Sequence, residues 1–319
     1  MMRKTCLNMV YELAKKDPRV VFVGSDLGPG VLQEMKDEMP ERFFMEGVSE
    51  ANIIGLAAGL AMEGFIPYVN TIATFLTRRC YEQVCLDLCL HNLPVRLIAN
   101  GGGLVYAPLG PTHLAVDDIA IMRALPNMTV TSVVDKEEMQ RLMPQTLDLP
   151  GPAYIRLAKG GDPIVSDNKN GFSLGKSILM REFSATQEAT KILFISTGIM
   201  SNRALAAAKA LAQEGKDCAV LHVHTIKPLD QARIINMVKH STLLVTLEEH
   251  TRIGGLGSAV IDCLVDSDTP LPKVLRMGLP DCFAKDYGNQ DSLLESMGLG
   301  LADIIANTQK AIAEEEALL

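Results

Sequence analysis

The sequence contains no tryptophan, and aromatic residues make up only 5% of its 319 residues. An aromatic-rich β-sandwich core is therefore a poor fit to this chain. Small and aliphatic residues and methionine are abundant instead, and hydrophobic residues reach 48% of the sequence. This composition favours packed layers of helices and strands, the α/β fold class.

Basic residues are in the minority, because 30 Lys and Arg stand against 38 Asp and Glu and give a net charge of -8. A general nucleic-acid surface needs clustered Lys and Arg, so we expect no nucleic-acid partner. No apolar run approaches the roughly 18–20 residues that span a bilayer, and no signal-type apolar core follows the first residues. We expect a cytoplasmic protein with no membrane partner, whose seven cysteines are reduced thiols.

The length of the chain predicts two domains. Strand-like and helix-like segments alternate over residues 5–157 and again over 191–276, which predicts two mainly parallel sheets flanked by helices. Polar, turn-forming residues separate the two patterns. We predict a first domain over 1–165, a connecting segment over 166–190 and a second domain over 191–319. Within the first domain, residues 74–90 are predicted to form one long helix.

Phosphate-binding loops are weakly represented. Residues 254–259 imitate a dinucleotide-binding glycine motif, but six residues separate them from the strand expected over 243–247. Close packing of a helix start on the sheet is the better interpretation of these glycines. The sequence has no G-x-x-x-x-G-K-[ST] motif, which argues against a P-loop nucleotide site.

Glu50 stands at the entrance to an apolar segment that carries no further charge before Glu63. Its carboxylate has three interpretations from the residues alone. It can cap the helix, where backbone N–H groups and the helix dipole favour an anion. It can lie in apolar surroundings and exchange a proton. It can also bind a metal ion, but no His or Asp residues stand at suitable spacing, so no metal site is predicted.

Several segments, in a constant order, are similar to motifs of the transketolase family of thiamine-diphosphate enzymes. They are Gly24-Ser25-Asp26-Leu27, Gly47-Val48-Ser49-Glu50-Ala51-Asn52, the helix entrance Thr74-Phe75-Leu76 with Tyr81-Glu82-Gln83, Gly110-Pro111-Thr112-His113, Thr225-Ile226-Lys227-Pro228-Leu229-Asp230, and Glu248-Glu249-His250 with Gly254-Gly255-Leu256-Gly257. The resemblance extends over essentially the whole chain. It implies a pyrimidine-binding α/β domain followed by a transketolase C-terminal domain.

The resemblance assigns three residues to the cofactor. Glu50 resembles the glutamate that hydrogen-bonds the aminopyrimidine and so promotes removal of the C2 proton of the thiazolium ring. Phe75 resembles the aromatic residue that stacks on the aminopyrimidine, although an ordinary core residue is the alternative. Asp26 is expected near the thiazolium cation, or otherwise as a simple turn residue. The spacing from Phe75 to Glu82 is one residue longer than in some relatives.

Two further residues are expected to contact substrate. His113 resembles the family's active-site histidine, which bonds substrate oxygens or moves protons. Arg156 resembles a substrate-phosphate arginine, and an ion pair at the end of a strand is the alternative. The sequence departs from the family at Leu109, where relatives often have an acidic residue that contacts a substrate hydroxyl. The departure indicates either a substrate without that hydroxyl or recognition by the glycines at 101–103.

The sequence lacks the Gly-Asp-Gly signature with which the family binds Mg²⁺ and the diphosphate. The resemblance therefore implies the C-terminal subunit of a split transketolase. An N-terminal subunit is expected to hold Mg²⁺ and the diphosphate, so that the two chains share thiamine diphosphate in an α2β2 assembly.

The expected reaction is transfer of a two-carbon ketol unit between a ketose, or its phosphate, and an aldehyde. The alternatives are a β subunit of a 2-oxo-acid dehydrogenase, a deoxyxylulose-phosphate-synthase-like reaction and a non-catalytic subunit with the same fold. Ketol-transfer, decarboxylation and cofactor-binding assays distinguish them.

Overall fold

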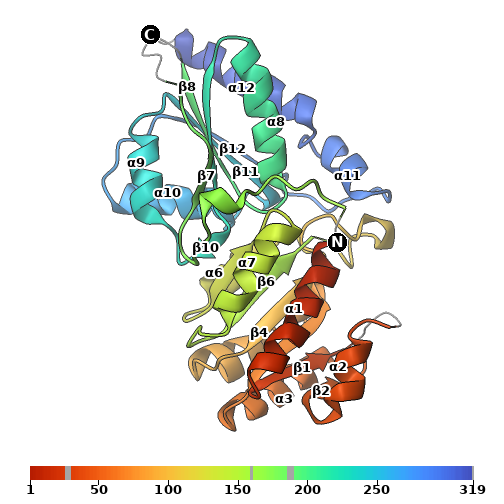
Figure 1. Ribbon diagram of the computed structural model, residues 1–319. Helices are drawn as coiled ribbons and strands as arrows, with labels where there is room; N and C mark the ends of the chain where they lie inside the picture. Colours follow the sequence, from red (N-terminus) through yellow and green to blue (C-terminus); the bar gives the residue numbers. More distant parts are fainter. Residues whose placement is uncertain (26–29, 159–160, 185–189, 318–319) are drawn as a thin grey trace.

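The computed structural model describes residues 1–25, 30–158, 161–184 and 190–317. Two α/β domains stack end to end, with the N-terminus near their junction and the C-terminus at the far end of the second domain (Figure 1). The fold class predicted from the sequence, two consecutive α/β domains with mainly parallel sheets, is confirmed. No helix in the described ranges is both long and apolar enough to cross a lipid bilayer.

The first sheet has seven strands in the order β10-β5-β6-β4-β3-β1-β2. Their bounds are β1 (Val20–Gly24), β2 (Phe43–Met45), β3 (Ile66–Ile72), β4 (Arg96–Asn100), β5 (Thr129–Ser132), β6 (Ala153–Leu157) and β10 (Thr225–Lys227). All neighbouring pairs are parallel except β10 with β5. β1, β4 and β6 are buried along their whole length, as expected where helices cover both faces of a parallel sheet.

Helices pack on both faces of this sheet. α1 (Met2–Lys16) and α7 (Lys136–Thr146) share one hydrophobic cluster, while α3 (Glu50–Met62), α4 (Ala73–Thr77) and α6 (Asp118–Ala124) belong to another. Shorter helical pieces are α2 (Gln33–Glu38), η1 (Pro40–Arg42), α5 (Tyr81–Gln83), η2 (Val84–Leu90), η3 (Ala107–Leu109) and η4 (Asn168–Asn170).

The second sheet has five strands in the order β12-β11-β8-β9-β7. They are β7 (Ile178–Arg181), β8 (Lys191–Ser196), β9 (Asp217–His222), β11 (Leu243–Thr251) and β12 (Lys273–Leu279). α8 (Met200–Gln213) and α12 (Leu301–Glu316) cover one face, and α9 (Gln231–Val238) and α10 (Leu256–Asp266) the other (Figure 1). α11 (Gln290–Ser296) lies beside the junction of the domains (Figure 1).

The two domains share side chains and backbone. One hydrophobic cluster joins the α3 and α4 face of the first sheet to the α9 and α10 face of the second. β10 lies within the expected second domain but pairs with β5 of the first sheet, and β7 lies within the segment 166–190 that was expected only to connect them. Both strands are short, so neither has enough residues to show a periodicity in the sequence.

The prediction of one helix over 74–90 is wrong. The chain forms α4, turns at residues 78–80, and then continues as α5 and the π-helical segment η2. At the break, Cys80 Sγ donates to the Phe75 carbonyl oxygen at 3.0 Å, and Thr77 Oγ1 donates to the Ala73 carbonyl oxygen at 2.8 Å. These side-chain bonds to backbone oxygens compete with regular helical bonding, which hydrophobic periodicity does not reveal.

Candidate functional site

Four of the five predicted site residues follow neighbouring strands of the first sheet. Glu50 comes after β2, Asp26 after β1, Phe75 after β3 and His113 after β4. The carboxyl ends of parallel strands meet at one edge, where α/β proteins commonly place ligands. Ser25 Oγ donates to Thr71 Oγ1 at 2.6 Å and so joins two of these strand ends. Asp26 itself lies outside the described residues.

Glu50 is the first residue of α3, and only 3% of its side chain is exposed. Its Oε2 accepts a hydrogen bond from Arg79 Nη1 at 2.8 Å, which makes an ion pair. Within the described residues, no side chain caps the start of this helix. Glu50 stands in the first turn of α3, where the helix dipole favours an anion, and its carboxylate is paired with Arg79.

Sequence reasoning missed Arg79. The break after α4 turns this residue back over the site, where its guanidinium carbon lies 4.0 Å from the centroid of the Phe75 ring. Arg79 thus contacts both Glu50 and Phe75, the two residues expected to hold the aminopyrimidine. The available signal was the extra residue between Phe75 and Glu82, which the turn accommodates.

His113 lies on the loop after η3. Its ring centroid is 5.2 Å from that of Phe75, and the two rings meet edge to face. Gly110 allows the loop to turn, because its φ of 76° lies in the left-handed region, and its carbonyl oxygen accepts from the His113 N–H at 3.0 Å. Nδ1 of His113 lies 2.9 Å from Thr112 Oγ1. The structure therefore brings Glu50, Phe75 and His113 to one place.

A cleft of about 580 Å³ opens beside these residues. Its lining includes Phe75, Arg78, Arg79 and Thr112 of the first domain, together with Phe283 of the second. Phe283 is 78% exposed at the mouth. Burial, with a smaller contribution from the Glu50 charge, raises the pKa of Cys80 to about 12, which argues against a thiolate nucleophile here.

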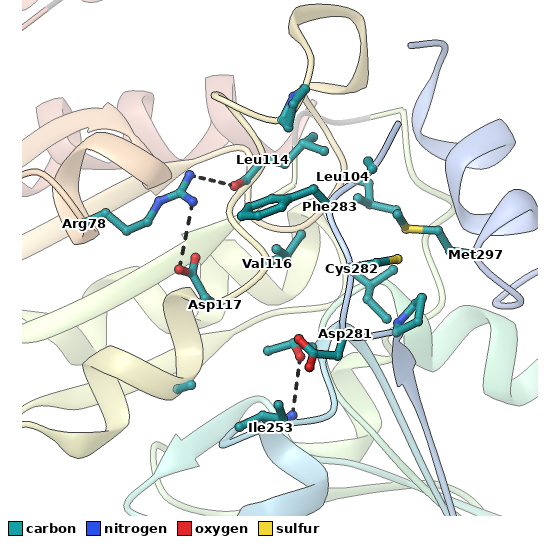
Figure 2. Close-up of a pocket in the computed structure, with 16 residues that line it drawn as sticks. Arg78, Leu104, Leu114, Val116, Asp117, Ile253, Asp281, Cys282, Phe283 and Met297 are labelled. Atoms are coloured by element: carbon teal, nitrogen blue, oxygen red, sulfur yellow. Dashed lines mark hydrogen bonds and ion pairs between the residues drawn. The ribbon is translucent and has the colours of Figure 1, made fainter. Parts of the chain in front are cut away.

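A second cavity of about 410 Å³ adjoins the cleft through Arg78 and Phe283 (Figure 2). Its walls are mainly apolar and include Leu104, Val116 and Met297, so it passes between the two domains. Figure 2 shows Arg78 reaching the Leu114 carbonyl oxygen and Asp117 at one side of this cavity. None of the predicted site residues lines it.

Arg156 lies away from the cleft in a buried ion pair. Its Nε donates to Asp118 Oδ2 at 2.7 Å, and its Nη2 donates to the backbone oxygens of Ala115 and Glu249. Burial alone would lower the pKa of Arg156, but the charges of Asp118 and Glu249 raise it. The structure contains the ion-pair alternative, and it does not bring Arg156 together with His113. The substrate-phosphate role stays a prediction.

The glycines at 101–103 pack against the protein. The N–H groups of Gly101 and Gly102 donate to the Leu157 carbonyl oxygen, and Gly103 exchanges backbone bonds with Ala115. A Cβ on Gly102 would come within 2.5 Å of the Arg156 side chain, so glycine is needed for close approach. These amides are occupied, which removes the support for substrate recognition by this loop. Leu109 is half exposed.

Glu248 occupies the start of α10, beside the glycines at 254–257. Its carboxylate accepts from the Leu256 N–H at 2.6 Å and the Gly257 N–H at 2.8 Å. β11 extends to Thr251, so the gap of six residues before the glycine motif was wrong. Close packing explains these glycines, as predicted, because a Cβ on Gly255 would lie 2.0 Å from Glu248. The side chain takes the place where a phosphate binds in dinucleotide folds.

A metal centre has no counterpart among the residues that the structure describes. They contain no group of three or more His, Cys, Asp or Glu side chains placed to hold a metal ion.

The model of the transketolase pyrimidine-binding domain matches residues 1–161, and that of the transketolase C-terminal domain matches residues 182–304. The chain belongs to the transketolase family. It is 36% identical over 305 residues to a 6-deoxy-6-sulfo-D-fructose transketolase subunit of Clostridium sp. (strain MSTE9), which covers 95% of this chain and 92% of that relative.

Two further likenesses define how much of a transketolase the chain represents. A 1-deoxy-D-xylulose-5-phosphate synthase of Synechococcus sp. (strain JA-2-3B'a(2-13)) is 34% identical, but this chain spans only 44% of its length. A solved structure of a split gene transketolase, an inactive β4 tetramer, is 33% identical with a TM-score of 0.87, and the match covers 98% of both chains. The chain is thus a C-terminal transketolase-like subunit, as the sequence motifs predicted.

Proposed function

We propose that this chain is the C-terminal subunit of a thiamine-diphosphate-dependent split transketolase that transfers a two-carbon ketol unit from a ketose to an aldehyde. The observation that carries the proposal is the buried Glu50 carboxylate beside the Phe75 ring, at the sheet edge where His113 also lies. This arrangement occurs in a chain that matches a split transketolase chain over 98% of both lengths.

The residues present fit the aminopyrimidine of the cofactor. Glu50 offers a hydrogen-bonding carboxyl group, Phe75 offers a ring to stack on, and a flat guanidinium already lies between them. Thiamine diphosphate, when bound, supplies a carbanion that the protein's own side chains cannot provide. Glu50 would hold a proton at N1′ of the pyrimidine, and its burial favours a short, water-free hydrogen bond.

His113 and Asp26 complete the proposed set. The His113 ring packs edge to face with Phe75 from a loop at the same sheet edge, where it would orient a substrate oxygen or move a proton. Asp26, by its position after β1, would lie near the thiazolium ring. Arg156 is left out of this set because its guanidinium has buried partners of its own.

A partner subunit would supply Mg²⁺ and the sites for the diphosphate, in an α2β2 complex. The support is that the similar split transketolase chain is described as inactive when it assembles as β4 alone. The cleft beside Phe75 also has an exposed aromatic residue, Phe283, at its mouth, as expected of a surface that another chain covers.

The substrates are proposed to be sugars or sugar phosphates. A relative that is 36% identical is named for 6-deoxy-6-sulfo-D-fructose, a ketose with an anionic end. Leu109 replaces the acidic residue of many relatives, and we expect a preference for donors that do not need that contact.

Reconstitution tests the proposal. The chain is mixed with the subunit of its own genome that carries the Gly-Asp-Gly signature, and the complex is assayed with ketose donors and aldehyde acceptors. We expect ketol transfer by the complex and none by either chain alone. Ketol transfer by this chain alone would contradict the requirement for a partner.

A second candidate reaction is a deoxyxylulose-phosphate-synthase-like condensation, which the 34% identity to such a synthase favours. The same complex is therefore assayed with a 2-oxo acid and an aldehyde phosphate. Release of CO₂ without ketol transfer would replace the first proposal by this second one. If CO₂ release also requires an acyl acceptor, the result would indicate a 2-oxo-acid dehydrogenase. Cofactor binding without turnover of any donor would indicate a non-catalytic subunit.

A further inference from the structure

Arg79 contacts Glu50 and Phe75, the two residues that are proposed to bind the aminopyrimidine of the cofactor. Its Nη1 lies 2.8 Å from Glu50 Oε2, and its guanidinium carbon lies 4.0 Å above the centre of the Phe75 ring. The carboxylate is 3% exposed, whereas 48% of the Arg79 side chain is exposed. The half-exposed guanidinium of Arg79 therefore covers both the buried Glu50 carboxylate and one face of the Phe75 ring.

The guanidinium resembles an aminopyrimidine in the features that these partners recognise. It is flat and delocalised, it stacks on aromatic rings, and it presents N–H groups in its own plane to a carboxylate. Both groups need the space between Glu50 and Phe75. They cannot stack on the same face of Phe75 together, because the guanidinium carbon already lies at stacking distance, 4.0 Å from the ring centroid.

We propose that Arg79 occupies the aminopyrimidine position and is exchanged for the cofactor when the cofactor binds. The inference rests on the proposed function, since it assigns the aminopyrimidine to Glu50 and Phe75. The route for exchange is short, because Arg79 lies on the exposed turn between α4 and α5 and its head needs only to rotate into water. Arg79 thereby compensates the buried charge of Glu50 until a ligand replaces it.

The exchange predicts competition between the arginine and the cofactor. Arg79→Met keeps an unbranched side chain but removes both the charge and the flat head, so the site no longer has to be vacated. We expect the complex with the partner subunit to bind thiamine diphosphate at least about fivefold more tightly in this variant, by isothermal titration calorimetry. Arg79→Lys retains the charge without the planar fork and should show an intermediate affinity.

Arg78→Met is the matched control. Arg78 is the neighbouring exposed arginine, but it reaches the Leu114 carbonyl oxygen and Asp117 instead of Glu50. The affinity of the Arg78→Met complex for thiamine diphosphate should stay within about twofold of the wild-type value. An equal gain in both variants would overturn the exchange, because it would show only a general effect of positive charge.

A direct reading comes from ¹⁵N NMR of the arginine side chains of the full chain. Addition of 4-amino-5-hydroxymethyl-2-methylpyrimidine, the pyrimidine part of the cofactor, should move the Arg79 guanidinium signal toward that of a solvated arginine. A signal that stays in place while the fragment binds would overturn the exchange.

The proposed function and the exchange fail in different ways. If the wild-type complex binds thiamine diphosphate and Arg79→Met binds it equally or more weakly, only the exchange is wrong. If neither complex binds the cofactor, the proposed function is wrong and the exchange falls with it.

Discussion

Two of the carboxylate–arginine pairs in this chain have nearly equal lengths but lie in very different surroundings. Glu50 and Arg79 meet at 2.8 Å beside an open cleft, and Asp118 and Arg156 meet at 2.7 Å between the two domains. Arg79 is 48% exposed, whereas Arg156 is 6% exposed and also holds a backbone oxygen of the second domain. The first pair can be exchanged for a ligand, while the second fixes one domain on the other.

The difference lies in what each arginine leaves behind when it moves. When Arg79 moves, its exposed head regains water, and the Glu50 carboxylate is the one group that it leaves without a partner. A buried guanidinium would leave an uncompensated Asp118 and unpaired backbone oxygens, which is a large penalty. A carboxylate–arginine pair therefore forms a replaceable contact beside the cleft and a permanent one between the domains.

Substitution of the two arginines by methionine should separate the regions most strongly. We expect Arg156→Met to lower the free energy of unfolding by about 3–5 kcal/mol, because Asp118 stays buried without its cation. Arg79→Met should lower it by less, about 1–2 kcal/mol, because a half-exposed head is lost, although Glu50 stays buried without its cation. Urea unfolding of the purified chain measures both values.

The substrate role of Arg156 is tested with the same variant. In the reconstituted complex, the folded fraction of Arg156→Met should keep the wild-type KM for a phosphorylated donor. An increase of tenfold or more in KM, without a loss of stability, would restore Arg156 as a substrate ligand and contradict its role between the domains.

Glu249 gives the region between the domains a dependence on pH. Burial raises its pKa from 4.5 to about 7, although the Arg156 charge opposes the shift. Between pH 4.5 and about 7, Glu249 therefore keeps its proton in the folded chain but has lost it in the unfolded chain. This stabilisation is complete below about pH 4.5 and is lost as the pH rises through about 7, a change of roughly 3 kcal/mol at about 1.4 kcal/mol for each pH unit.

Glu249→Gln should remove this contribution. Its stability relative to the wild type should therefore increase from pH 5 to pH 8, measured as the difference between urea unfolding midpoints. Glu295→Gln, at an exposed position, is the control and should show no such trend. A constant difference for Glu249→Gln would mean that Glu249 titrates at its ordinary pKa.

Phe75→Ala, a substitution in the cleft, should have the smallest effect of those considered. Loss of the ring should weaken the binding of thiamine diphosphate by the complex about two- to twelvefold, since stacking is worth about 0.5–1.5 kcal/mol. Phe283→Ala removes an exposed ring of the same cleft from the other domain and should change the affinity less. Calorimetric titration of both complexes compares them, and a larger effect of Phe283→Ala would reverse the assignment.

The sequence predicted the fold class and the gathering of Glu50, Phe75 and His113 well. Parallel strands have long buried runs, and every strand that leads to the site ends at the same edge of the sheet, so order along the chain is enough to place these residues. The family motifs added the identity of the site, which composition and periodicity do not contain.

Arg79 was missed, and the sequence left Arg156 between a substrate role and an ion pair, for physical reasons. The position of Arg79 depends on the turn after Thr77, where side-chain bonds to backbone oxygens interrupt a helix that periodicity alone predicts as continuous. The surroundings of Arg156 depend on contacts with Glu249, which is 93 residues away. The short strands β7 and β10 were missed because their pairing partners, not their own residues, define them.

The proposed role of Glu50 is to activate a cofactor that a partner subunit helps to hold. Its most direct test is the exchange rate of the thiamine diphosphate C2 proton in deuterium oxide, followed by NMR in the reconstituted complex. Glu63→Gln, at the other end of the same helix, is the control and should leave the rate unchanged. We predict that Glu50→Gln slows the exchange at least about a hundredfold. An unchanged rate in Glu50→Gln, with the cofactor bound, would contradict the claim.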